Sequence, residues 1–198
     1  MVAAAPLASA QTFAYGGGGG ALESSIETVY YDVEGTSLNQ IGQSLRQRGP
    51  VTGGKTFFGL TEWSLNTNYN WVERDTGCSI EDLVVRIGIT ITMPRWDAPA
   101  GAPHELLQTW NRFKHSLREH EHGHARLAQE AADAVRWELA TLRYPTCANA
   151  EFRARQRVAE IVQEYNRRNE HYDRVTSHGT TEGAVWPPRQ GFNGSLGR

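Results

Sequence analysis

Hydrophobic residues alternate with polar ones along two stretches in the first half of the chain. The segment 61–71, TEWSLNTNYNW, has large apolar side chains at every second position over most of its length, and the segment 83–94, LVVRIGITITMP, repeats the pattern. A period of two places these side chains on one face of a β-strand. They are Trp63, Leu65, Tyr69 and Trp71 in the first segment and Leu83, Val85, Ile87, Ile89, Ile91 and Met93 in the second. We therefore expect two long strands of a sheet with one buried face.

An earlier part of the chain predicts a short strand followed by a helix. The segment 28–33, TVYYDV, has the β-branched and aromatic residues typical of a strand. After it, Ser37 is suited to cap a helix whose inner face would carry Leu38, Ile41 and Leu45. Gly49 and Pro50 then predict the end of that helix.

The second half of the chain follows a helical period. Apolar positions spaced by three and four residues predict a long helix over about 103–143. Its inward-facing line runs through Leu106, Trp110, Phe113, Leu117, His120, His124, Leu127, Ala131 and Val135. A second helix is expected over about 149–173, with Val158, Val162, Tyr165, Asn169 and Tyr172 on its inner face. The elements together indicate an α+β fold, in which a twisted, mainly antiparallel sheet packs on the first long helix.

The first long helix carries the motif HExxH on its inward-facing line, as His120, Glu121 and His124. Residues four apart on a helix project side by side, so the two imidazoles can bind one Zn²⁺ while Glu121 reaches its water. Zinc lowers the pKa of that water to about 7, and a glutamate can act as its general base. Burying each imidazole without a partner costs about 1–3 kcal/mol, which a metal ion would offset. The alternative is a pair of core histidines bonded to carboxylates.

A catalytic zinc needs a third protein ligand, and two residues near the end of the second helix are candidates. Asp173 falls on the inner face of that helix, and His178 lies in the loop that follows. The sequence leaves this choice open, with a slight preference for His178 as a third neutral donor. Tyr172 is a candidate for stabilising an oxyanion, although a buried aromatic residue with a bonded hydroxyl explains it equally well. His115 and His122 point to the outer face of the first long helix and are not expected to be ligands.

Composition and charge narrow the class of protein. The chain has 198 residues, 39% of them hydrophobic, and a formal net charge of -2 without long runs of one sign, which argues against a nucleic-acid partner. It contains no run of eighteen apolar residues, so no membrane span is expected. The segment ASA before Gln11 fits the end of a secretory signal peptide, and the glycines at 16–20 predict a flexible tether with nothing to pack.

The two cysteines, Cys78 and Cys147, are an even pair. In an exported chain they favour a disulfide, which would close a loop of about 70 residues and stabilise the fold by about 4 kcal/mol. Without export, two buried thiols would be the better interpretation.

Several segments resemble a bacterial domain-of-unknown-function family described as secreted zinc-dependent proteases. They are YYDVEGTSLNQIGQSLRQRGP, GLTEWSLNTNYNW, TMPRW, HEHGH and YDRVTSHGTTEGA, which together extend from about residue 29 to 184. The resemblance implies a zinc site at His120, His124 and Glu121, and it covers both Asp173 and His178.

The combined interpretation is a zincin-like domain over residues 26–186, preceded by a leader over 1–25 and followed by a tail over 187–198. We expect a bacterial metalloprotease, periplasmic or secreted, with one Zn²⁺ and a peptide or protein substrate. Two alternatives stay open at this point. One is a zinc amidase acting on cell-wall or other amides, and the other is a non-catalytic module with a structural metal site.

Overall fold

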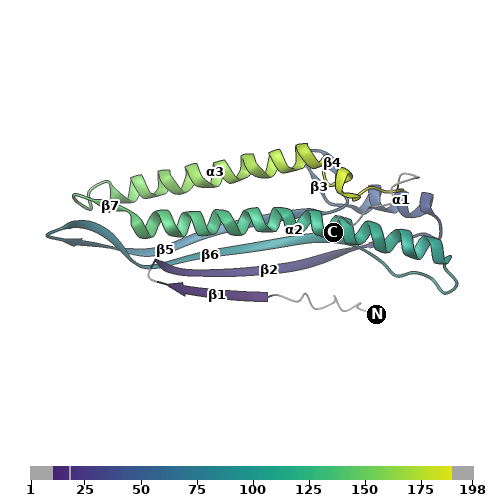
Figure 1. The fold of residues 1–198 in the computed structure, drawn as a ribbon, viewed down its shortest axis with the longest axis horizontal. Helices are drawn as coiled ribbons and strands as arrows, with labels where there is room; N and C mark the ends of the chain where they lie inside the picture. The colour runs from purple at the N-terminus through teal and green to yellow at the C-terminus, as the bar shows by residue number, and fades with distance from the viewer. Residues whose placement is uncertain (1–10, 18, 189–198) are drawn as a thin grey trace, which may run out of the picture. The chain divides into compact units, whose positions relative to one another are not determined.

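The fold was obtained as a computed structural model, which describes residues 11–17 and 19–188. Its long elements are two helices, α2 and α3, and the strands β2, β5 and β6 (Figure 1). In chain order the elements are β1 Gln11–Gly17, β2 Gly20–Val33, α1 Leu38–Arg48, β3 Val51–Thr52, β4 Lys55–Thr56, β5 Leu60–Arg74, β6 Gly77–Trp96, α2 His104–Thr141, β7 Arg143–Tyr144, α3 Ala150–Thr176 and the 3-10 turn η1 Thr180–Glu182. The expected α+β class is confirmed.

The chain divides into two compact units, each assembled from three stretches of sequence. Of the described residues, the first contains those up to Thr28, Glu62–Thr90 and His124–Glu170. The second contains Val29–Thr61, Ile91–Gly123 and the described residues from His171 onward.

The main sheet has the strand order β1-β2-β6-β5, with β7 added to β6. Strands β1 and β2 are antiparallel, as are β6 and β7. Strands β2 and β6 run parallel, because two ion pairs join them at the same sequence offset: Glu23 to Arg86 and Asp32 to Arg95 are both 63 residues apart. In an antiparallel pair, the sequence separation between facing residues would change from one end of the strands to the other. The sheet is therefore mixed: the β1–β2 and β6–β7 pairs are antiparallel, as expected, whereas the parallel β2–β6 pair was not predicted, since side-chain alternation is the same for either strand direction.

The two predicted long strands are confirmed, and both are longer than the alternating pattern. The inward positions of β6 are all buried: Leu83, Val85, Ile87, Ile89, Ile91 and Met93. On β5 the same alternation holds, but the inward side chains are only half-buried. β5 is the last strand in the sheet order, so its outer edge is unpaired within the described sheet.

Helix α1 begins as the sequence predicts. The Ser37 hydroxyl accepts a hydrogen bond from the backbone N–H of Gln40 at 3.3 Å, which caps the first turn. Ile41 and Leu45 are fully buried. Leu38 was expected on the same buried face but is 41% exposed. It is the first residue of the helix, where the packing of the buried face ends.

The two long helices lie close to their predicted bounds. In the first unit they run alongside one another (Figure 1), and the Arg157 guanidinium donates to the Glu138 carboxylate at 2.8 Å. Most of the inward-facing line predicted for α2 is buried, including Leu106, Leu117 and Val135. Within the described residues, no helix has both the length and the apolar character needed to cross a bilayer.

An aromatic cluster in the second unit holds the segment that follows α3. Trp186 lies 5.3 Å from Phe113 and 5.8 Å from Trp110, measured between ring centroids, and Trp110 lies 5.6 Å from Trp96. The indole N–H of Trp186 donates to the carbonyl of Leu38 at 2.9 Å. These contacts hold the segment that follows η1, a turn that contributes to the site described below.

The prediction of a flexible tether at 16–20 was wrong for the described glycines, because Gly16 and Gly17 lie in β1 and Gly20 begins β2. Gly17 pairs with Gly20 where β1 turns into β2, and Gly20 has a φ of +91°. A Cβ at position 20 would lie 2.8 Å from the Cβ of Leu83, so the missing side chain allows a close approach of β2 to β6. The expected signal-peptide remnant at 1–10 and most of the predicted tail lie outside the described residues.

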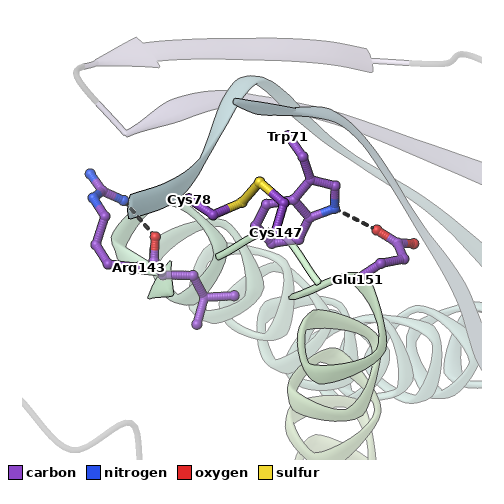
Figure 2. Close-up of a disulfide and its surroundings, with 6 residues drawn as sticks. Trp71, Cys78, Arg143, Cys147 and Glu151 are labelled. Atoms are coloured by element: carbon purple, nitrogen blue, oxygen red, sulfur yellow. Dashed lines mark hydrogen bonds between the residues drawn. A yellow bond between two sulfur atoms is a disulfide. The ribbon is translucent and has the colours of Figure 1, made fainter. Parts of the chain in front are cut away.

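The predicted disulfide between Cys78 and Cys147 is present, with its Cα atoms 5.1 Å apart (Figure 2). It ties the start of β6 to the connection between α2 and α3. Beside it, the indole N–H of Trp71 donates to the carboxylate of Glu151 at 2.8 Å, as Figure 2 shows. The hydroxyl of Tyr69 donates to the same carboxylate at 3.2 Å.

Candidate metal centre

Helix α2 carries the two histidines of the HExxH motif, one turn apart. Since α2 is uninterrupted from His104 to Thr141, the spacing of His120 and His124 is set by the helix itself. His120 is 3% exposed, and His124 is half-buried. Their predicted inward orientation is confirmed, whereas His115 and His122 are exposed, as expected for the outer face.

Asp173, near the end of α3, brings a carboxylate to the first of these imidazoles. Its Oδ1 lies 3.3 Å from Nε2 of His120. His120, His124 and Asp173 each offer one ligand atom, and the three atoms lie within 4.8 Å of one another. Among the described residues they form the one group of three or more such side chains that could hold a metal ion.

The donor types, and the separation between two of the donor atoms, fit a small divalent cation. Bonds of about 2.0–2.1 Å in a tetrahedron separate neighbouring donor atoms by about 3.3–3.4 Å. The separation of His120 Nε2 and Asp173 Oδ1 is 3.3 Å. Two imidazoles and one carboxylate are also a ligand set that zinc accepts with a position left open.

The side-chain amide of Asn169 determines which nitrogen of the His124 ring carries the proton. The Asn169 Nδ2 donates to the carbonyl of Tyr165 at 3.0 Å, which leaves its Oδ1 facing Nδ1 of His124 at 2.7 Å. An amide oxygen can only accept, so Nδ1 of His124 carries the proton. The lone pair of that imidazole is then on Nε2, the nitrogen suited to bind a metal ion.

The ring of His120 is held in the same manner by Glu182 of the η1 turn. Nδ1 of His120 lies 2.9 Å from the carboxylate Oε2 of Glu182, which can accept a ring N–H at that nitrogen. Nε2, on the opposite side of the ring, faces Asp173. With a metal ion on Nε2, the proton of each imidazole would lie on Nδ1, away from the group of candidate ligand atoms.

Tyr172 contacts both His120 and Glu182. Its ring stacks on His120 with centroids 5.0 Å apart, and its hydroxyl donates to the Glu182 carboxylate at 3.2 Å. Gly123, inside the HExxH motif, makes this approach feasible, because a Cβ there would lie 2.6 Å from Cζ of Tyr172. The Tyr172 hydroxyl thus contacts Glu182, and its role as an oxyanion stabiliser stays a prediction.

Glu121, the expected general base, is 4% exposed and lies against the start of β5. The Thr61 hydroxyl lies 2.8 Å from its Oε2 and 3.1 Å from its backbone carbonyl oxygen. A Cβ at Gly59 would lie 2.6 Å from Oε1 of Glu121. The carboxylate thus occupies space that only a glycine at position 59 leaves open.

His178 lies outside the group of candidate ligands, although the sequence slightly favoured it. Its Nδ1 is 3.3 Å from Oδ1 of Asp173, and its side chain is 55% exposed. The backbone of His178 has a φ of +51°, which is uncommon for a residue with a side chain. Its ring meets the edge of Phe57 at 5.2 Å. The structure therefore places His178 beside the candidate ligand Asp173 and not within the ligand group.

Sequence reasoning missed the roles of Glu182, Asn169 and Thr61. A signal for Glu182 existed, because metal-binding histidines usually donate their second N–H to a carboxylate, carbonyl or water. The segment GTTEG, with glycines on either side, also favours a tight turn. Thr61 gave no such signal, since its contact with Glu121 depends on how α2 lies against the start of β5.

In a comparison with known protein families, residues 28–179 match the family described as "Bacterial protein of unknown function (DUF922)". No curated protein and no solved structure matches the chain. The match covers most of the strands and helices described above, together with His120, Glu121, His124 and Asp173. The chain therefore belongs to this bacterial family of unknown function.

Proposed function

We propose that the chain is a zinc-dependent hydrolase that cleaves peptide bonds. The observation that carries this proposal is the group formed by His120, His124 and Asp173, on a helix that also carries the buried Glu121. Two imidazoles whose Nδ1 atoms face acceptors on other residues, with a carboxylate as the third donor, match a catalytic zinc site with its fourth position open.

The chemistry divides between the cation and the chain. A bound Zn²⁺ would act as a Lewis acid and make water a good nucleophile near neutral pH. Glu121 would accept the proton of the attacking water and pass it to the leaving amine. Thr61, through its hydrogen bond to Oε2, would hold the Glu121 carboxylate in position for this transfer.

A peptide is the substrate class that the sheet supports best. β5 is the last strand in the sheet order, and Thr61, at its start, contacts Glu121. An extended peptide could add to such an edge through backbone hydrogen bonds, which would carry its scissile bond toward Glu121. We extend the proposal to a zincin-like arrangement, in which an edge strand and the HExxH helix enclose the substrate.

The disulfide supports a location outside the cytosol. Disulfides persist in the bacterial periplasm and outside the cell, and they are rare in reducing compartments. We therefore propose that the chain works in the periplasm or as a secreted protein.

Glu121→Gln is the test of the catalytic proposal. The variant should keep its metal ion and lose nearly all turnover on a casein substrate, since the amide cannot accept the proton. Thr52→Ala, in the exposed strand β3, is a control that should leave turnover unchanged. Activity that survives in Glu121→Gln would remove the proposed role. Hydrolysis of peptidoglycan fragments without hydrolysis of casein would replace the protease assignment with a cell-wall amidase.

A further inference from the structure

The η1 turn places an acidic side chain against the buried histidine of the site. Glu182 Oε2 lies 2.9 Å from Nδ1 of His120, and Nε2 of the same ring lies 3.3 Å from Asp173. Glu182 lies just beyond residues 28–179, which match the family. We infer that Glu182 is a positioning residue that selects the tautomer of His120 and thereby raises the affinity of the site for its metal ion.

The turn is shaped to deliver this carboxylate. Gly179 and Gly183 flank it with φ values of +76° and +93°, conformations that favour glycine. A Cβ at Gly179 would lie 2.8 Å from Cγ of His120, so the backbone itself packs against the imidazole. The N–H of Ala184 closes the turn on the Gly179 carbonyl at 2.9 Å. Because Ala184 leads to the buried Trp186, both ends of the turn are held.

A second residue orients the carboxylate. The Tyr172 hydroxyl lies 3.2 Å from each oxygen of Glu182, while its ring stacks on His120. One tyrosine therefore restrains both partners of the hydrogen bond. A surface glutamate that met His120 by chance would lack such a restraint.

The two histidines of the site differ in the charge of their partners. His120 faces the carboxylate of Glu182, whereas His124 faces the neutral amide of Asn169. A carboxylate at Nδ1 makes Nε2 a stronger donor than an amide does, and loss of such a partner typically lowers metal affinity by about 10–100-fold. We therefore expect Glu182 to contribute more to the affinity than a neutral acceptor would.

The first test uses the metal-free protein, so it does not depend on turnover. Long-range ¹H–¹⁵N NMR spectra should show a proton on Nδ1 of His120 in the wild type, whereas in Glu182→Ala the remaining carboxylate, Asp173, should draw the ring proton to Nε2. Glu170→Ala, which changes an exposed glutamate of α3, is the matched control and should leave the His120 signals unchanged. An unchanged Nδ1 tautomer in folded Glu182→Ala would overturn the inference.

The second test measures the Zn²⁺ dissociation constant by competition with a chelator. Glu182→Gln retains an acceptor without the charge, so its affinity should lie between that of the wild type and that of Glu182→Ala, which should be weaker by about 10–100-fold. Equal affinities in all three proteins would overturn the inference. The inference rests on the proposed metal site, but failure of the two can be told apart. Absence of zinc from the wild type would contradict the proposed function, whereas the tautomer measurement still decides the role of Glu182.

Discussion

Nδ1 of His124 and Oδ1 of Asn169 lie 2.7 Å apart, joining the second histidine of the HExxH motif to the inner face of α3. Asn169 is itself held, because its Nδ2 donates to the carbonyl of Tyr165. Asn169→Leu should remove this acceptor and weaken Zn²⁺ binding by about 10–100-fold. A competition titration against a chelator measures the change. Asn166→Leu, at an exposed position on the same helix, should bind as the wild type does, and equal affinities of the two variants would contradict this role for Asn169.

Gly59 should control where the Glu121 carboxylate lies. A Cβ at position 59 would come within 2.6 Å of Oε1, and a flexible side chain can move away at little cost in stability. If Glu121 is the general base that we propose, Gly59→Ala is expected to keep its fold and its metal ion but to lose turnover by at least about tenfold, since that base is displaced. Steady-state kinetics and metal analysis of one preparation measure both effects. Gly88→Ala, where a Cβ would meet only ordinary contacts, is the control. Unchanged turnover in Gly59→Ala would show that Glu121 does not need this space.

Removal of the disulfide should destabilise the fold without changing the ligand set. Cys78 and Cys147 are 69 residues apart in sequence, and closing such a loop stabilises a protein by about 4 kcal/mol in the chain-entropy model. The double variant Cys78→Ala and Cys147→Ala should therefore unfold at a lower denaturant concentration, and reductant should lower the stability of the wild type alone. Insensitivity of the wild type to reductant during unfolding would contradict the prediction.

Glu151 should make the stability depend on pH in the acid range. The hydrogen bond from Trp71 is the largest effect that holds the pKa of Glu151 below its ordinary value of 4.5, with Arg155 and Tyr69 adding to it. A lowered pKa in the folded state stabilises the protein at pH values above 4.5, and the stabilisation is lost as the pH falls through the folded-state pKa. Glu151→Gln should therefore be less stable than the wild type at pH 7, with a smaller difference at pH 3. Urea unfolding at both pH values measures this, and a difference that grows toward pH 3 would contradict it.

The same carboxylate affects Tyr69, whose pKa is raised to about 12 by burial first and by the charge of Glu151 second. In Glu151→Gln the tyrosine should ionise at a lower pH, because the repulsion from the carboxylate is absent. Difference absorbance of the tyrosinate during an alkaline titration measures this shift, with Tyr69→Phe identifying the signal. An unchanged titration of Tyr69 would contradict the contact between the two groups.

The parts of the fold that follow from local pattern were predicted well. The alternation of β6, the Ser37 cap and the inward position of His120 and His124 depend on periodicity and on neighbouring residues alone. The parallel pairing of β2 with β6 could not be predicted, since strand direction leaves no trace in a pattern of alternating residues. The pairing of Gly17 with Gly20 was missed for a related reason, because a glycine run fits both a flexible segment and a tight turn.

The residues of the site likewise divide into those that a local pattern predicts and those that depend on how the chain folds. The HExxH spacing predicts two ligands from helix geometry, but the choice between Asp173 and His178 depends on where α3 ends. The helix continues to Thr176, which keeps Asp173 on the helix, whereas Ser177 and His178 follow in left-handed conformations. This turn at the end of α3 directs the His178 ring to Phe57 and to the outer side of Asp173.

The central claim is that His120, His124 and Asp173 bind one zinc ion. Elemental analysis of the purified wild type, beside His120→Ala, Asp173→Ala and His178→Ala, tests it most directly. We predict one zinc ion per chain in the wild type and in His178→Ala, and loss of stoichiometric zinc in the other two variants. A wild type without bound metal, or one that retains iron in place of zinc, would contradict the claim.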